Sequence, residues 1–433
     1  MRVVYLTAGA GGMYCGSCMH DNTLAGALAK QGVDIQLIPL YTPIRTDETD
    51  VSVDRVFFGG INVYLQQKIP LFRHVPAFLD RFLDHPWLLR MATSGAGDTS
   101  PKEFGALAVS MLKGTNGYQR KEVRRLCSWL ASSVKPHVVN LSNMLIGGCV
   151  PEMKNQLGVP IVVTLQGDDV FLDELAEPFK SRAFDEIRRL VDYVDAFVVN
   201  SRYYAEYMSE YFSIPHEKFH VVPLGINTTD FQESHERRRE LGEPLTIGYL
   251  ARIAPEKGLH ILVDAFIELR KRDGMERTQL RIAGWLGEKS REYAESLFDR
   301  LRKAGLENAF EYVGEVDRAG KIDFLSKIDV LSVPSIYRDP KGLYVLEALA
   351  TGVPVIQPDH GAFPELIEKT KGGRLVPAED PKALASQLEL LLAEENTRVM
   401  LGQSGRQAVH EHFHAERMAQ ETLLLYERLT EKK

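Results

Sequence analysis

Short apolar runs alternate with amphipathic segments along almost the whole chain, and this alternation limits the fold more than any other feature. The first apolar run, residues 3–6, is followed by glycines, a helical stretch at about 21–30 and a second run at 33–40. Strand, helix and strand in this order are typical of βαβ units and predict an α/β fold with a mostly parallel sheet. The other predicted strands of the first half are residues 138–141, 161–165 and 196–200.

The same pattern restarts in the second half of the chain. A predicted strand at 246–250 precedes a helix at about 259–272, and further strands follow at 280–284, 310–313, 330–333 and 353–356. Turn residues at 223–227 and a charged run at 233–240 indicate a linker, so we place the domain junction near 225–243. The prediction is an N-terminal domain over 1–228 and a C-terminal domain over 243–412. Two doubly wound domains place a ligand in the cleft between the loops at the carboxyl ends of their strands.

Composition agrees with a globular protein of this size. At roughly 150 residues per domain, 433 residues predict two or three domains. Hydrophobic residues make up 44% and charged residues 26%, which argues against disorder and coiled coil. The chain has 52 basic and 59 acidic residues, a net charge of -7, whereas nucleic-acid binders usually have a basic excess. We therefore expect no nucleic-acid partner.

The sequence predicts a cytoplasmic protein without a membrane span. No run reaches about 18 consecutive apolar residues, the length that crosses a bilayer as a helix. The N-terminus lacks the features of a signal peptide. Residues 68–92 mix large apolar side chains with Lys and Arg. They form either a basic amphipathic surface for an acceptor or the inner membrane face, or a helical pair packed on the first domain.

A glycine loop follows the first predicted strand. Glycines such as Gly11 and Gly12 let the backbone approach a ligand and open a helix whose N–H groups favour anions. Counting from Gly9, the sixth position is Tyr14, so the segment departs from the dinucleotide-binding pattern G-x-G-x-x-G. Asp34 keeps dinucleotide binding as an alternative, because an acidic residue about 20 positions further on belongs to that pattern.

Two cations, Arg252 and Lys257, follow the first strand of the second domain. On a loop between strand and helix they suit a diphosphate, because Arg offers a planar fork of donors and Lys a point charge. The alternative is an exposed loop with solvated charges.

The most specific motif surrounds a helix predicted to begin near Leu343. Free N–H groups at Gly342 and Leu343 would point at the ligand. Asp339 precedes this helix and Glu347 lies one turn inside it. A carboxylate that accepts two hydrogen bonds is a natural clamp for vicinal sugar hydroxyls, so these acids would hold sugars on either side of the phosphates.

Residues 246–377 resemble the donor domain of retaining glycosyltransferases of family 4, which have the GT-B fold of two Rossmann-like domains facing a central cleft. The first half is similar at 199–203 and 222–226, so the resemblance covers nearly the whole chain. The matching motifs stand in the family order at Arg252, Glu256-Lys257-Gly258, 313–316, Pro334-Ser335, Gly342-Leu343, Glu347-Ala348, 352–355, Glu365 and Gly372-Gly373.

The resemblance implies roles for four donor-side residues. Arg252 and Lys257 would bind the donor diphosphate, and Glu347 would contact the ribose. Asp339 stands where the family has the Glu that faces the transferred sugar, and its side chain is one methylene shorter. This departure implies either a different donor preference or a weaker activity.

The resemblance also implies positions around the base, the acceptor and the C-terminus. Glu315 and Val316 would lie near the base, and a final helix at about 415–433 would return to the first domain. Gln166 stands where the family often has a His, and Gln cannot take up a proton at neutral pH. Asp168 is the nearest carboxylate to this position, either as a catalytic residue or as a turn former.

Four cysteines are too few for a disulfide scaffold. Cys15 and Cys18 form a C-x-x-C at a predicted helix N-terminus, where the thiol pKa is expected to fall. With Cys149 and His20 they could form a metal or cluster site, or they could be redox-active. The alternative is that they are small residues in a tight turn, while Cys127 belongs to the core.

The sequence therefore predicts a retaining glycosyltransferase. It would move a hexose-type sugar from a UDP or GDP sugar to a hydroxyl of a glycan, lipid or small molecule by front-face transfer. The chain contains no D-x-D triplet, so we expect no metal at the diphosphate and no cofactor. Two alternatives stand beside it: a non-catalytic nucleotide-sugar-binding or regulatory protein of the same fold, and an enzyme regulated through Cys15 and Cys18.

Overall fold

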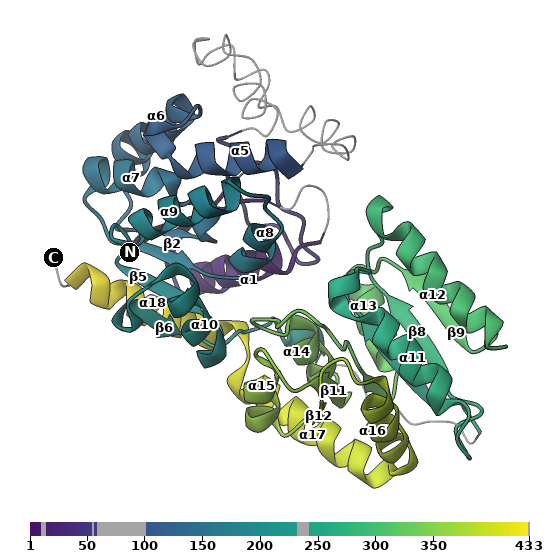
Figure 1. The fold of residues 1–433 in the computed structure, drawn as a ribbon. Coiled ribbons are helices and arrows are strands. Elements are labelled where there is room, and N and C mark those ends of the chain that lie inside the picture. Colours follow the sequence, from purple (N-terminus) through teal and green to yellow (C-terminus); the bar gives the residue numbers. More distant parts are fainter. Residues whose placement is uncertain (10–13, 54–55, 59–100, 232–241, 432–433) are drawn as a thin grey trace. The chain divides into compact units, whose positions relative to one another are not determined.

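The chain divides into two compact units (Figure 1). The computed structural model describes residues 1–9, 14–53, 56–58, 101–231 and 242–431. Unit 1 comprises Met1–Pro223 and Glu416–Lys433, and unit 2 comprises Leu224–Ala415.

Unit 1 is built on a six-stranded parallel sheet in the order β2-β1-β3-β4-β5-β6. The central strands β3, β4 and β5 are buried along their whole length because helices cover the sheet. The strands are β1 (Arg2–Thr7), β2 (Asp34–Pro39), β3 (Val138–Leu141), β4 (Ile161–Thr164), β5 (Ala196–Val199) and β6 (Phe219–Val221). The helices are α1 (Gly16–Lys30), α5 (Pro101–Leu112), α6 (Arg120–Trp129), α7 (Val150–Leu157), α8 (Asp168–Asp173), α9 (Phe179–Val191), α10 (Arg202–Phe212) and α18 (Ala415–Glu431).

Unit 2 contains a second six-stranded parallel sheet in the order β12-β11-β10-β7-β8-β9. Its strands are β7 (Thr246–Leu250), β8 (Gln279–Ala283), β9 (Phe310–Gly314), β10 (Val330–Leu331), β11 (Val355–Pro358) and β12 (Gly373–Val376). Its helices are α11 (Leu259–Leu269), α12 (Arg291–Lys303), α13 (Arg318–Ser326), α14 (Leu343–Ala350), α15 (Phe363–Thr370), α16 (Pro381–Ala393) and α17 (Glu395–His412).

The predicted fold class is confirmed, and the predicted strands are present in both sheets. The prediction missed two strands, β6 and β12. Both lie at a sheet edge and are partly exposed, so they carry no continuous apolar run. Helix α1 begins at Gly16 rather than near Asp21, because the backbone turns helical directly after Cys15.

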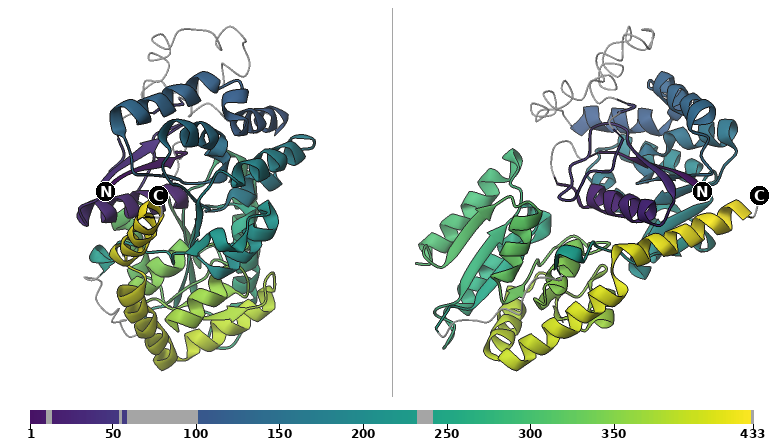
Figure 2. Two further views of the ribbon diagram at one scale, coloured as in Figure 1. Left: turned by 90° about the vertical axis from the view of Figure 1, so that its left-hand side faces the viewer. Right: turned by 180° about the vertical axis from the view of Figure 1, so that it is seen from behind.

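The C-terminal helix α18 belongs to unit 1, although the chain passes through unit 2 before it. Its position beside the other elements of unit 1 can be followed in Figure 2. The fully buried Tyr426 donates its hydroxyl proton to Asn140 Oδ1 on β3 at 3.1 Å. The C-terminal end of the chain therefore packs on the central part of the sheet of unit 1.

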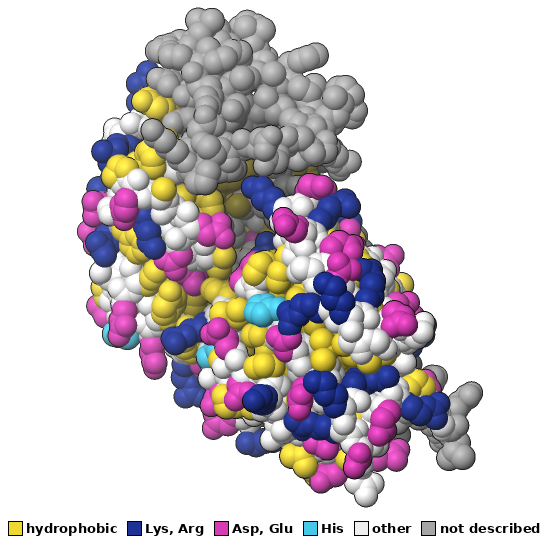
Figure 3. Space-filling model, turned by 45° about the vertical axis from the view of Figure 1, so that its right-hand side comes forward, with side chains coloured by type: hydrophobic (Ala, Val, Ile, Leu, Met, Phe, Trp, Pro, Cys, Tyr) yellow, Lys and Arg dark blue, Asp and Glu magenta, His cyan; other side chains and the backbone are white. Residues whose placement is uncertain are grey.

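The described surface is mixed in charge. In Figure 3, basic and acidic side chains alternate over the face shown. The described helices include none with the length and apolar character needed to cross a bilayer. Residues 68–92 and the charged run at 233–240 lie outside the described residues.

Candidate functional site

The sheet of unit 2 has a topological switch point beside its first strand, β7. Strands β8 and β9 extend the sheet on one side of β7, and β10, β11 and β12 extend it on the other. The loops after β7 and β10 therefore diverge at the carboxyl edge, which is where doubly wound sheets bind ligands. Arg252 and Lys257 follow β7, and Asp339 and Glu347 follow β10.

Lys257 and Asp339 form a mostly buried ion pair at this switch point. Lys257 Nζ lies 2.7 Å from Asp339 Oδ2, and Asp339 is only 6% exposed. The ammonium also lies 5.7 Å from the ring centroids of Tyr337 and Tyr344. The ion pair joins two of the predicted site residues, although they are 82 positions apart in the chain.

Asp339 also caps the loop that leads into α14. Its Oδ1 accepts hydrogen bonds from the amides of Lys341 at 3.1 Å and Gly342 at 3.0 Å. Burial opposes ionisation, but Lys257 and these amides outweigh it and hold the pKa of the Asp339 carboxyl at about 2. The expectation of a free Gly342 N–H was wrong, because the short side chain of Asp339 folds back onto it. Helix α14 begins at Leu343, as predicted.

Arg252 lies on the same loop as Lys257 but is more exposed. Its guanidinium donates to Glu256 Oε1 at 2.5 Å, and both side chains are more than a third exposed. Such an exposed pair is weak, so an incoming phosphate can compete for the guanidinium.

The Glu256 backbone carbonyl holds the two loops together. It accepts hydrogen bonds from the Ile336 amide at 3.0 Å, the Tyr337 amide at 3.2 Å and the Ser335 hydroxyl at 3.0 Å. Gly258 permits this approach, since a Cβ there would lie 1.8 Å from the Pro334 carbonyl oxygen. The cationic loop and the acidic loop therefore form one assembly.

Glu347 is buried inside α14 and forms an ion pair that the sequence did not predict. Its Oε1 accepts from Lys321 Nζ on α13 at 2.6 Å, and the two side chains are 5% and 8% exposed. Glu315 and Val316, the predicted base-region residues, follow β9 at the sheet edge, two strands from β7. Glu315 is exposed.

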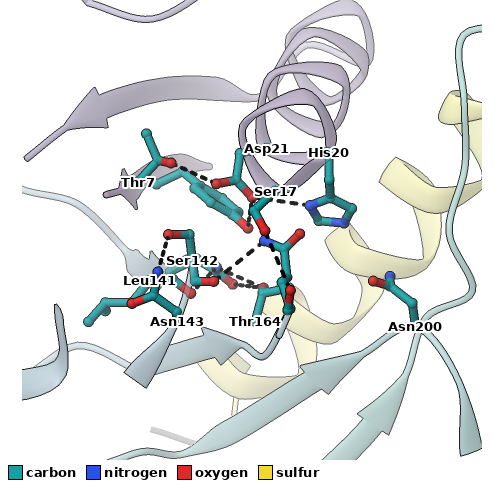
Figure 4. A network of polar contacts seen from close by, with 12 residues as sticks. Thr7, Ser17, His20, Asp21, Leu141, Ser142, Asn143, Thr164 and Asn200 are labelled. Carbon is teal, nitrogen blue, oxygen red and sulfur yellow. Dashed lines mark hydrogen bonds and ion pairs between the residues drawn. The ribbon is translucent and has the colours of Figure 1, made fainter. Parts of the chain in front are cut away.

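Unit 1 has its own polar cluster at the carboxyl edge of its sheet, shown in Figure 4. Asp21, on α1 and fully buried, is its centre. The hydroxyls of Tyr5 and Thr7 each donate to its carboxylate at 2.8 Å. The Gln166 side-chain amide also donates to it at 2.8 Å, and His20 Nδ1 lies 3.1 Å from it.

Gln166 is therefore held in place by a buried carboxylate. The same amide lies 3.4 Å from the Ser142 carbonyl oxygen, so it joins the loops after β3 and β4 to α1. These contacts fix the orientation of the Gln166 side chain. Gln166 is buried, with only 7% of its surface exposed.

Asp168 also ties loops together, through both of its carboxylate oxygens. The Met144 amide donates to Oδ1 at 2.6 Å and the Gln166 amide to Oδ2 at 3.2 Å. Burial raises the pKa of Asp168 to about 7, against the lowering effect of these amides and with a smaller rise from Asp169. Asp168 therefore exchanges its proton close to neutral pH.

The cysteines do not form the common site that we considered. Cys149 lies in the same buried core as Cys127, and its thiol donates to the Ile146 carbonyl at 3.1 Å. The Cys18 thiol hydrogen-bonds to Cys15, and this bond and burial raise its pKa, contrary to the expected fall. Within the described part of the chain, no group of three or more His, Cys, Asp or Glu side chains is arranged to hold a metal ion. Gly11 and Gly12 lie outside the described residues.

Lys321 and Asp21, which contact the predicted residues Glu347 and Gln166, were not among the predicted candidates. Lys321 shares the buried face of α13 with Phe324 and Leu325, so a lysine on an otherwise apolar face was the available signal. Asp21 gave a similar signal, as an acid within the buried part of α1. His20 was considered only as a metal ligand.

Two family models match adjacent parts of the chain. The model for Glycosyltransferase Family 4 matches residues 90–230, and the model for Glycosyl transferases group 1 matches residues 230–408. The second match contains all the candidate residues of unit 2 described above.

Curated relatives match the chain in part or almost throughout. The D-inositol 3-phosphate glycosyltransferase of Corynebacterium efficiens is 27% identical over 225 residues, covering 50% of this chain and 52% of the relative. An uncharacterised glycosyltransferase of Methanocaldococcus jannaschii is 26% identical over 421 residues, covering 95% and 94%. The chain spans about half the length of the inositol-phosphate glycosyltransferases that it matches.

Solved structures share the fold over its whole length. Anabaena HepE in complex with UDP has a TM-score of 0.69 at 15% identity, covering 99% of this chain and all of that chain. The likeness confirms the GT-B fold.

Proposed function

We propose, from the premise that this chain belongs to the group 1 and family 4 glycosyltransferases, that it transfers a sugar from a nucleotide-diphospho-sugar to a hydroxyl acceptor. The donor would be a UDP or GDP sugar of the hexose type. HepE, which shares the fold, is described in complex with UDP, and this supports a nucleotide donor.

The observation that carries the proposal is the assembly of charges at the switch point of unit 2. Arg252, Lys257 and the first turn of α14 offer positive charge and N–H donors from two loops that hydrogen-bond to each other. A diphosphate needs such a set, because two adjacent phosphates carry negative charge on several oxygens. Glu347 lies one turn into α14 and offers a carboxylate to the ribose.

The reaction that fits these groups is a front-face substitution with retention. The bond between the sugar C1 and the diphosphate oxygen breaks while the acceptor oxygen bonds to C1 from the same face. The acceptor proton passes to the departing diphosphate, so charge and atoms balance. Arg252 and Lys257 would stabilise the charge that develops on the diphosphate, without a metal ion.

A double displacement through a carboxylate nucleophile is less well supported. Such a mechanism needs a carboxylate that can attack C1. Asp339 is held by Lys257 and two amides, and Glu347 by Lys321, so both are occupied as hydrogen-bond acceptors.

Asp168 and Gln166 remain candidates for contacts with the sugar acceptor in unit 1, since they lie at the carboxyl edge of its sheet.

The first test is thermal stability of the full chain with UDP, GDP, ADP and their sugar conjugates, each with and without EDTA. Binding to the native state alone adds about 2.7 kcal/mol at a hundredfold excess over Kd. We expect a shift with one nucleotide series that EDTA does not reduce. Arg252→Ala should weaken that shift, whereas Lys289→Ala, outside both loops, should not.

The second test is transfer of a radiolabelled sugar from the selected donor to a panel of acceptors. A lower rate of donor hydrolysis or of sugar transfer in Arg252→Ala and Glu347→Ala supports an enzyme. Nucleotide binding with neither transfer nor slow hydrolysis of the donor would favour the non-catalytic alternative. If no nucleotide raises the unfolding temperature in the first test, both functions are contradicted.

A further inference from the structure

We propose that Lys321 is a positioning residue, which holds the Glu347 carboxylate in one orientation so that the site selects ribonucleotides over 2′-deoxyribonucleotides. This inference rests on the proposed function, since it assumes that Glu347 faces the ribose of the donor. It assigns a new role to a residue outside the family motifs described above.

Lys321 lies where a lysine is costly without a partner. It belongs to the buried face of α13, together with Phe324 and Leu325, and its side chain is 8% exposed. Charged side chains are rarely buried to this extent unless they are paired. Its Nζ reaches Glu347 Oε1 at 2.6 Å, and this ion pair offsets the cost.

Glu347 is equally unusual on its own helix. Every residue of α14 from Tyr344 to Ala350 is buried, and Glu347 is the one ionisable carboxyl among them. Replacing a buried ion pair by apolar residues of similar volume often leaves stability unchanged or higher. Stability alone therefore does not account for this pair.

The ion pair also has the chemistry that ribose recognition needs. A neutral carboxylic acid would donate one proton, whereas a carboxylate only accepts, with about four lone-pair sites on two oxygens. Lys321 binds Oε1, and a carboxylate can accept several hydrogen bonds at once, including bonds from the two hydroxyls of a ribose. Because α13 and α14 are separate helices of one unit, the pair fixes the carboxylate from outside its own helix.

The experiment compares ribose with 2′-deoxyribose in the Lys321→Met variant. Binding of UDP, GDP and ADP, and of their 2′-deoxy forms, is measured by titration calorimetry on the full chain. The unaltered chain should prefer one ribonucleotide over its deoxy form by about tenfold or more, as expected for a hydrogen bond to a charged group. Lys321→Met should abolish this preference by weakening the ribonucleotide, while the deoxy form changes by less than about twofold.

A second variant guards against a folding defect. Lys321→Met removes the Lys321 partner of a buried carboxylate, whereas the double variant Lys321→Met/Glu347→Gln removes both charges. The double variant should have the same affinities as Glu347→Gln alone, because Lys321 acts through Glu347. Lys327→Met is the matched control: its exposed ion pair with Asp323 lies at the end of the same helix and should not affect ribose preference.

The outcomes separate this inference from the proposed function. If Lys321→Met weakens both forms equally, or keeps the ribose preference, Lys321 is structural only and the inference is overturned. If the unaltered chain binds a nucleotide without ribose preference, the inference fails while the donor site stands. If it binds none of the three ribonucleotides, the proposed function fails with it.

Discussion

Asp339 shows how one missing methylene changes what a residue does. A longer Glu could extend past the loop, but the Asp339 carboxylate accepts hydrogen bonds from the amides of Lys341 and Gly342 and from the Lys257 ammonium. Its position in this structure is that of a loop cap and of an ion-pair partner for Lys257, the lysine that we propose binds the diphosphate. We therefore expect Asp339 to act on the donor through Lys257.

The first residue-scale prediction concerns Asp339→Asn and pH. The folded pKa, about 2, lies below the ordinary 3.8, so the carboxylate stabilises the fold above pH 3.8. This contribution is lost as the pH falls from 3.8 towards 2. Asp339→Asn should therefore cost about 2 kcal/mol at pH 7 and much less at the acid end of that range. Thermal unfolding at pH 7 and pH 3 measures it, and an equal loss at both values would contradict the ion pair.

Asp21 is the second residue-scale prediction. Its buried carboxylate accepts from Tyr5, Thr7 and Gln166, so an amide in its place would turn one NH2 group towards donors. Asp21→Asn should destabilise unit 1 by about 2–4 kcal/mol. Asp34→Asn, which removes an exposed ion pair with Arg2, should cost no more than about 1 kcal/mol. Chemical unfolding measures both free energies. Similar losses of stability for the two variants would show that the polar cluster stabilises unit 1 no more than an exposed ion pair does.

At the scale of elements, the loops after β7 and β10 act as one assembly because Gly258 allows contact. Gly258 has φ +71, and a Cβ would collide with the Pro334 carbonyl. Gly305 has φ +74, with nothing within 4 Å of a Cβ. Gly305→Ala should cost about 1 kcal/mol from backbone strain alone. Gly258→Ala should cost clearly more and also weaken nucleotide binding. Thermal unfolding and titration calorimetry measure the two effects. Equal losses of stability and of nucleotide affinity in Gly258→Ala and Gly305→Ala would contradict a role for the loop contact.

At the scale of the whole molecule, α18 makes unit 1 depend on the end of the chain. Tyr426 is fully buried and hydrogen-bonds to Asn140 on β3. Tyr426→Ala should destabilise unit 1 by about 3–5 kcal/mol, as expected for a large buried side chain. Leu424→Ala, at a position that is 49% exposed, should have little effect. Limited proteolysis followed by mass spectrometry locates the cleavage sites, and we expect new sites in unit 1 of Tyr426→Ala. New sites confined to unit 2 would contradict the prediction.

Periodicity and glycine placement by themselves predicted the α/β class, both sheets and the start of α14. These features are local: a buried parallel strand needs an apolar run, and a helix starts where Pro and Gly end. The motif order also predicted that Arg252, Lys257, Asp339 and Glu347 belong to one family pattern. It did not predict which of them would touch.

Only the tertiary structure decided the partners of these charges. Lys257 pairs with Asp339 and Lys321 with Glu347 across 82 and 26 positions, and no local pattern encodes such distances. The raised pKa of the Cys18 thiol likewise depends on tertiary packing, since it comes from the hydrogen bond to Cys15 and from burial. Burial and pairing depend on how distant segments pack, so the sequence could name the charged residues but not their electrostatic environment.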